Sequence, residues 1–142
     1  MAAPNTKPIM PLVPNNGGST SFTTLTAANT NTNGTGTTPT VFTAGANGGG
    51  RCDRIRCVPL GTNVATVLRL FVNNGNTNAT ATNNCCIAEV QLPATTASNS
   101  APNGPPIDIP IELSLPVGHK INACIGTAVA AGWALYPVGG DY

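Results

Sequence analysis

Residues 107–115 have the sequence IDIPIELSL, in which apolar side chains occupy every second position. This two-residue period is typical of a β-strand with one face buried and the other exposed to solvent. Pro110 has no backbone N–H to donate, so we expect the strand to lie at a sheet edge or to carry a bulge. The stretch therefore predicts a half-buried strand in a β protein.

The chain from residue 22 onward predicts seven further strands, and no segment shows the 3.6-residue period of a helix. Residues 64–73 are apolar on both faces, which favours a central strand. The other expected strands are 22–27, 40–44, 51–60, 85–92, 119–126 and 128–138. Long polar connections at 29–39, 73–84 and 93–106 favour an all-β, single-domain β-sandwich of jelly-roll or related Greek-key topology.

Residues 1–20 are expected to form an extended, Pro-rich N-terminal arm ahead of a β-sandwich domain at 21–142. Four prolines exclude a helix and disfavour a central strand. Four apolar side chains could anchor the arm on a neighbouring subunit: Ile9, Met10, Leu12 and Val13. The alternative is a frayed terminus that makes no lasting contact.

The composition argues against catalysis. Of 142 residues, only 8% are charged and one is histidine, whereas 20 are threonine and 17 are asparagine. Asp108 and Glu112 share a strand face but would be roughly 13 Å apart, too far for a glycosidase pair. No nucleophile, zinc-protease or phosphate-loop motif is present. We therefore expect a non-enzymatic protein without cofactor.

Arginines at positions 51, 54 and 56 form the basic cluster of the sequence. Arg54 and Arg56 would share one strand face and could bind a carboxylate or phosphate on a partner. Asp53 lies among them, no aromatic residue accompanies them and the formal net charge is +1, so we expect no direct nucleic-acid binding. Arg54 and Arg56 are accordingly candidate partner-binding residues.

The five cysteines are odd in number and irregular in spacing, so we expect reduced thiols that act as small apolar side chains. They lack the paired spacing of a zinc site, and no metal is expected. His119 is expected in a solvated turn. Trp133 is expected in the core, although a sugar-stacking patch with Tyr136 and Tyr142 is an alternative.

No apolar stretch approaches the roughly 20 residues of a membrane span. The prolines near the N-terminus also interrupt any apolar core of a secretory signal. We therefore expect no membrane association and synthesis in the cytoplasm.

Several segments together resemble small virion structural proteins of tailed bacteriophages. The resemblance covers residues 24–142 and is carried by PLGTNVATVLRLFVNNG (59–75), EVQLPATTAS (89–98), LPVGHKINACIGT (115–127) and GWALYPVGGDY (132–142). It implies a β-sandwich that decorates or cements a capsid, commonly as a homotrimer, and it implies no active-site residues.

The expected function is therefore a non-enzymatic virion protein on the capsid surface, bound to the major capsid protein or other virion proteins. Two alternatives remain: a neck, tail or fibre component of the phage particle, and a carbohydrate-binding β-sandwich module. Thr/Asn loops fit a contact surface because they offer hydrogen bonds with little dependence on salt.

Overall fold

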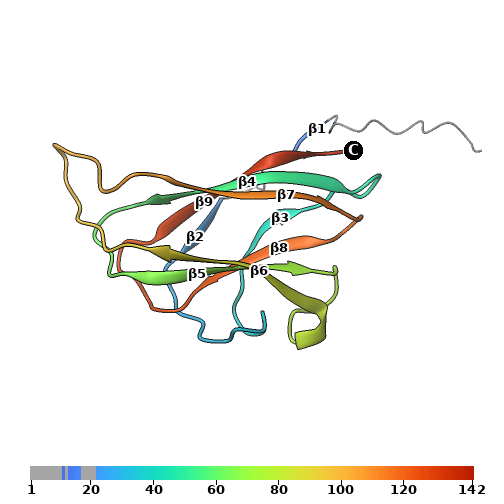
Figure 1. Ribbon diagram of the computed structural model, residues 1–142, viewed down its shortest axis with the longest axis horizontal. Helices are drawn as coiled ribbons and strands as arrows, with labels where there is room; N and C mark the ends of the chain where they lie inside the picture. The colour runs from blue at the N-terminus through green and yellow to red at the C-terminus, as the bar shows by residue number, and fades with distance from the viewer. Residues whose placement is uncertain (1–10, 12, 17–21) are drawn as a thin grey trace, which may run out of the picture.

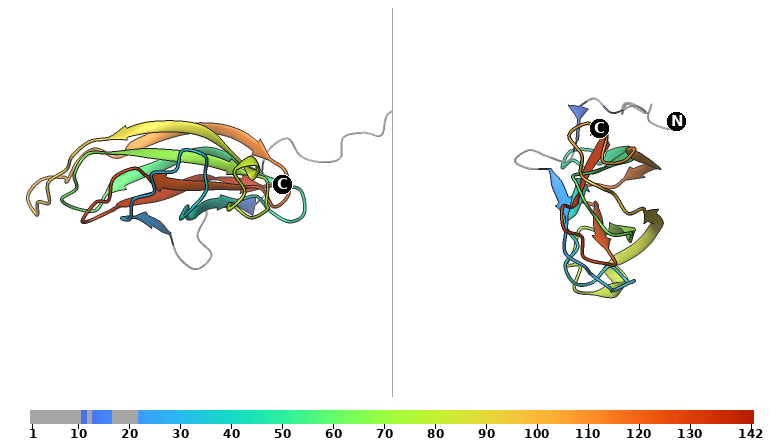
Figure 2. Two further views of the ribbon diagram at one scale, coloured as in Figure 1. Left: turned by 90° about the horizontal axis from the view of Figure 1, so that it is seen from below. Right: turned by 90° about the vertical axis from the view of Figure 1, so that its left-hand side faces the viewer.

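The protein is a β-sandwich in the computed structural model, which describes residues 11, 13–16 and 22–142. Two antiparallel sheets pack face to face, and the end-on view in Figure 2 shows them as two layers (Figures 1 and 2). Apart from a single 3-10 turn at Ala81–Asn83, the regular structure of the described residues is all strand. The predicted all-β sandwich is confirmed.

Sheet A has the strand order β1-β9-β4-β7, with β2 also paired to β9. Its strands are β1 (Val13–Pro14), β2 (Thr23–Leu25), β4 (Gly50–Pro59), β7 (Ile107–Leu115) and β9 (Trp133–Asp141). Sheet B has the order β3-β8-β5-β6. Its strands are β3 (Thr40–Thr43), β5 (Thr66–Asn73), β6 (Asn84–Leu92) and β8 (Lys120–Ile125).

The strand pairs are nested along the chain. The pair β5·β6 lies innermost in sequence, followed by β4·β7, β3·β8 and β2·β9. The eight strands thus follow the path of one long hairpin whose successive pairs alternate between the two sheets. We infer from this nesting a jelly-roll topology.

Strand β7 lies at the edge of sheet A, as the proline in its sequence predicts. It also carries a bulge, because Cys52 pairs with Leu113 and Arg54 with Pro110, so that two residues of β7 face one of β4. Glu112, inside the bulge, has a φ of 52° in the left-handed region. The missing donor of Pro110 and the bulge therefore occur together on an edge strand.

The core lies between the two sheets and is apolar. Strand β5 is central in sheet B, as predicted, and Leu68 and Leu70 point into this core with no exposed surface. Trp133 is likewise fully buried, which confirms its predicted core position. Other buried members of the cluster include Phe42, Ile55, Leu92, Ile121, Ile125 and Leu135.

Phe71 is buried outside this core, on the opposite face of β5. The Thr/Asn loop before β3 packs on it, since a Cβ at Gly34 would lie 3.1 Å from Cδ1 of Phe71. Asn78 Nδ2 joins this loop to the loop before β6 by donating to the Gly36 carbonyl at 2.7 Å and to Thr38 Oγ1 at 2.8 Å. Gly34 has a φ of 79°, and a Cβ there would lie 2.6 Å from Cβ of Asn84, so glycine is required for the close approach.

The last strand differs from its predicted bounds of 128–138. It begins at Trp133 because Gly132, with a φ of 94°, ends a turn that holds the preceding apolar residues in a loop. Strand β5 begins at Thr66 rather than at residue 64, and Val64 is 56% exposed in the connecting loop. Because these two loops contain apolar side chains, the sequence pattern predicted the start of each strand too early.

Candidate interaction surface

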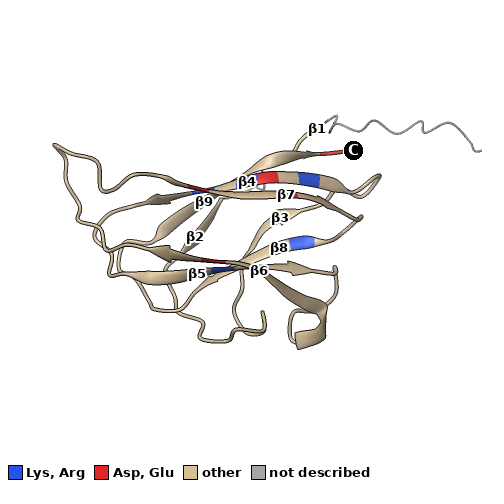
Figure 3. Ribbon diagram, in the orientation of Figure 1, with Lys and Arg blue, Asp and Glu red and all other residues tan. Residues whose placement is uncertain are grey.

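The two predicted partner-binding arginines lie on the outer face of sheet A. Strand β4 is flanked by β9 and β7, and its side chains alternate: Ile55 and Cys57 are fully buried, while Arg54 and Arg56 are exposed. The prediction that both arginines share one exposed face is thus confirmed. Figure 3 shows how sparse charged residues are over the whole fold, which makes any cluster of them informative.

Arg56 is held by an acidic residue of the neighbouring strand. Its Nε and Nη2 atoms each donate to one carboxylate oxygen of Asp108, both at 2.7 Å. This hydrogen bonding raises the pKa of Arg56 and lowers the pKa of Asp108. The bidentate geometry fixes the guanidinium plane on the surface, while 44% of the arginine side chain stays exposed.

An aromatic pair continues this row across the sheet. Tyr136 of β9 is the register partner of Arg56, so Tyr136, Arg56 and Asp108 lie side by side on three adjacent strands. The ring of Phe22 lies against that of Tyr136, with centroids 5.5 Å apart. Phe22 is 60% and Tyr136 39% exposed. Sequence reasoning missed this pairing, because residues 22 and 136 meet only through β2 and β9.

A shallow hollow of about 220 Å³ adjoins the row. It is lined by Asp53, Arg54, Asp108, Pro110 and Glu112. Asp53 is paired with Arg51 at 2.6 Å, whereas Arg54 has no ion-pair partner within the described part of the chain. Of the two predicted arginines, Arg54 is thus the one whose guanidinium is open to a partner.

The described part of the predicted arm lies along the same sheet. Val13 and Pro14 pair with Asp141 and Gly140 of β9, and Asn15 continues the contact through its backbone N–H to Gly139. This short edge strand accommodates a proline. Val13 is 59% exposed and remains accessible to a partner. The other three predicted anchors, Ile9, Met10 and Leu12, lie outside the described residues.

The predicted sugar-stacking alternative around Trp133 does not form, because Trp133 is fully buried. Tyr142 contacts Ser114 of β7, with the two hydroxyl oxygens 2.9 Å apart. His119 is half-buried rather than solvated, since the β3 end packs beside it and its carbonyl accepts from Ala44 N at 2.9 Å. Its Nδ1 is buried without a hydrogen-bond partner in the described structure.

The cysteines fall into two groups. Cys52, Cys57 and Cys124 are buried, whereas Cys85 and Cys86 are exposed on the edge strand β6, and all five are free thiols. Burial raises the pKa of both Cys52 and Cys57 to about 12. Burial also raises the pKa of Cys124, against a smaller opposing effect of Arg69.

Within residues 11, 13–16 and 22–142, no group of three or more His, Cys, Asp or Glu side chains is placed to hold a metal ion. The same residues contain no helix long and apolar enough to cross a membrane. No protein-family model, curated protein or solved structure matches the chain. The interpretation of this surface therefore rests on its own geometry.

Proposed function

We propose that this protein is a non-enzymatic structural component of a bacteriophage particle that decorates and cements the capsid through the outer face of sheet A. The observation that carries the proposal is the exposed row of Phe22, Tyr136 and Arg56. The few residues that dominate binding at protein interfaces are enriched in Trp, Tyr and Arg. The sequence resemblance described above supports the phage particle as the setting.

The proposed partner is the major capsid protein, and the proposed location is the capsid surface of the virion. A homotrimer over capsomer junctions fits the resemblance. Near-zero net charge reduces the repulsion between copies packed side by side. Repetition over a lattice converts modest single-site contacts into avid attachment.

The charge arrangement also supports a contact with low salt dependence. Arg56 is paired with Asp108 and Arg51 with Asp53. Arg54, which has no ion-pair partner among the described residues, shares its hollow with the acidic Glu112. The face therefore carries little net charge. Attachment through such a face depends mainly on apolar contact and hydrogen bonds. We expect binding to change little between low and moderate ionic strength.

The proposal is tested by co-sedimentation with undecorated, expanded capsids of the phage that carries this coding sequence. Phe22→Ala combined with Tyr136→Ala should lower the apparent affinity at least about tenfold, as loss of a hot-spot residue does. The matched control is Val64→Ala, because Val64 is similarly exposed but lies in the loop before β5. Saturable binding of the parent and the control, with loss in the double variant, supports the proposal.

If the double variant still bound capsids saturably, attachment would not use the outer face of sheet A. Absence of any binding to capsids, together with pelleting with isolated tails, would instead favour the neck, tail or fibre alternative. The two results therefore distinguish a protein of the capsid from one of the neck, tail or fibre.

One observation favours a carbohydrate-binding module as a second candidate. The exposed Phe22 and Tyr136 rings lie beside the hydrogen-bonding pair of Arg56 and Asp108, and such a combination can stack on and orient a sugar. Glycan binding by the isolated protein, without any shell, would support this candidate over the capsid proposal.

A further inference from the structure

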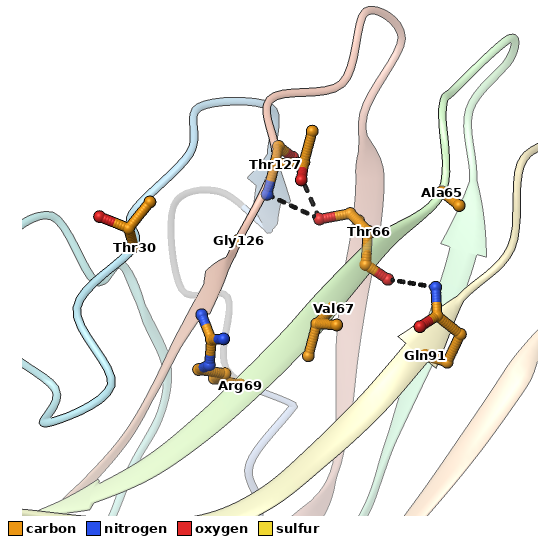
Figure 4. A pocket seen from close by; sticks show the side chains of 8 residues that line it. All are labelled: Thr30, Ala65, Thr66, Val67, Arg69, Gln91, Gly126 and Thr127. Atoms are coloured by element: carbon orange, nitrogen blue, oxygen red, sulfur yellow. Dashed lines mark hydrogen bonds between the residues drawn. The ribbon is translucent and has the colours of Figure 1, made fainter.

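A second hollow lies on the opposite side of the molecule, on the outer face of sheet B (Figure 4). It has a volume of about 370 Å³, which falls within the range of small-ligand sites. Its walls come from the loop after β2, from β5 and β6, and from the end of β8. The lining residues are Thr30, Ala65, Thr66, Val67, Arg69, Gln91, Gly126 and Thr127.

Arg69 is the one charged residue of this lining. Its side chain is 16% exposed, and its Nε donates to Glu89 Oε1 at 2.6 Å. The Nη1 atom is buried and has no hydrogen-bond partner among the described residues. A buried donor without an acceptor costs about 1–3 kcal/mol. The guanidinium also interacts with the Cys124 thiol, but sulfur is a weak acceptor, so an oxygen acceptor brought to its Nη groups would be favourable.

Two features shape the hollow around the guanidinium. Gly126 leaves it room, since a Cβ at that position would lie 3.3 Å from Nη1 of Arg69. Thr66 and Thr127 fix the adjacent wall, because Thr127 N donates to Thr66 Oγ1 at 2.9 Å and Thr66 Oγ1 donates to the Thr127 carbonyl at 3.1 Å. Figure 4 shows Arg69 below these bonds, with Gly126 above it and Val67 beside it. The site is therefore built before any ligand enters.

Neutral groups complete the lining. Thr30 lines the hollow from the opposite loop, and its hydroxyl oxygen points away from Arg69 and Thr66 (Figure 4). Gln91 Nε2 donates to the Thr66 carbonyl at 3.0 Å and closes the β6 side. Ala65 and Val67 add apolar surface. A guanidinium beside an apolar wall is the arrangement of a site for a small organic acid.

We propose that this hollow binds a carboxylate group, with the Arg69 guanidinium as its principal donor. A carboxylate is a strong acceptor for guanidinium N–H groups, as Asp108 shows on Arg56 in this same protein. On Arg69 the Nε is already bound to Glu89, so the ligand would accept from the terminal Nη groups. A phosphate dianion fits less well, because the lining holds a single cation and Glu89 already balances part of its charge. The proposal is independent of the proposed capsid role.

The experiment titrates the isolated full chain, observed by amide NMR, with two carboxylate probes from different sources. One probe is glucuronate, a sugar acid, with glucose as its neutral control. The other is N-acetylglutamate methylamide, an acidic side chain, with the corresponding glutamine compound as its control. Saturable shifts at Arg69, Gly126 and Thr127 with either acid, and at least about tenfold weaker binding of its neutral control, support the site. Whichever acid binds shows whether the site prefers a sugar acid or an acidic amino-acid side chain.

Two variants test the role of the guanidinium. Arg69→Gln should abolish binding of the acid, whereas Glu89→Gln should strengthen it several-fold by removing the carboxylate that competes for Arg69. Glu89 is 55% exposed at its side chain, so this second variant leaves the fold intact. Should Arg69→Gln fail to fold, Gly126→Ala replaces it, because its methyl group would press on Nη1 and weaken binding.

Three results would overturn the proposal. They are the absence of saturable shifts with both acids, equal shifts with acids and neutral controls, and unchanged affinity in Glu89→Gln. None of them bears on attachment to capsids, so this site and the outer face of sheet A are tested separately.

Discussion

The side chain of Asn63 binds both backbone groups of Gly132. Its Nδ2 donates to the Gly132 carbonyl at 3.1 Å, and its Oδ1 accepts from Gly132 N at 2.8 Å. Asn63 is only 3% exposed, and its backbone also pairs with that of Thr95. One buried amide thus joins three loops at one end of the sandwich.

We expect Asn63→Ala to lower the free energy of unfolding by roughly 2–4 kcal/mol, because it leaves several buried backbone groups without partners. Urea denaturation measures the loss. The matched control is Asn76→Ala in an exposed loop, which should stay within about 0.5 kcal/mol of the parent. Equal stability of the two variants would contradict the structural role of Asn63.

Leu70→Ala should cost roughly 2–5 kcal/mol, because Leu70 is fully buried in the central strand of sheet B. His119→Ala removes a half-buried side chain whose Nδ1 has no partner in the described structure, and it should cost clearly less. Thermal and urea unfolding of both variants provide the comparison. A larger loss for His119→Ala would show that the core is misplaced.

The thiols should differ sharply in reactivity. In the native protein, Cys85 and Cys86 should react rapidly with a disulfide reagent, because both are exposed. Cys52 and Cys57 should not, since burial raises their pKa to about 12 and leaves little thiolate. Denaturation under non-reducing conditions should release all five thiols. Recovery of fewer would reveal a disulfide bond.

The buried thiols also predict a loss of stability in alkali. Their pKa is about 12 in the folded protein, against an ordinary value of 9.0. Below about pH 8 the thiols stay protonated in both the folded and the unfolded protein, so the full stability is present. Above about pH 9 the unfolded chain loses these protons more readily than the folded protein does. Stability should then fall by up to about 1.4 kcal/mol per pH unit for each thiol until about pH 12.

Urea titrations at increasing pH measure this slope. The control is Cys52→Ala combined with Cys57→Ala, which keeps every other alkaline titration. An identical slope in parent and control would mean that the two thiols do not carry the effect.

Two truncations separate the functions of the N-terminal segment. Removal of residues 1–10 keeps β1 and should leave stability unchanged, while weakening attachment to capsids or sister subunits if Ile9 and Met10 are anchors. Removal of residues 1–16 also deletes Asn15, whose Nδ2 donates to Thr43 O at 2.8 Å and Asp141 Oδ1 at 2.9 Å. That loss should cost about 1–2 kcal/mol. Equal capsid binding by the full chain and the shorter truncation would leave the arm without a role in assembly.

Local patterns predicted most of the fold. The alternation at 107–115 fixes which side chains enter the core, because strand geometry imposes a period of two. The apolar residues on both faces of 64–73 predicted a central strand, which β5 is. Pro110 predicted the edge position for the same local reason. The exposed face shared by Arg54 and Arg56 followed from the alternation of β4.

Contacts between distant loops could not be predicted in this way. The partners of Asn63, the meeting of Phe22 with Tyr136 and the cover over Phe71 all depend on which strands become neighbours. In the sequence, Asn63 is indistinguishable from the many other asparagines of turns. The hollow around Arg69 depends equally on four separate segments, and its one sequence signal is an arginine within an apolar strand.

A cryo-EM map of undecorated capsids incubated with the protein tests the central claim most directly. We predict additional density at fixed lattice positions, with the outer face of sheet A, marked by Phe22, Tyr136 and Arg56, turned toward the shell. Capsids without additional density at saturating protein, or density that meets the shell through the Thr/Asn loops of sheet B, would contradict it.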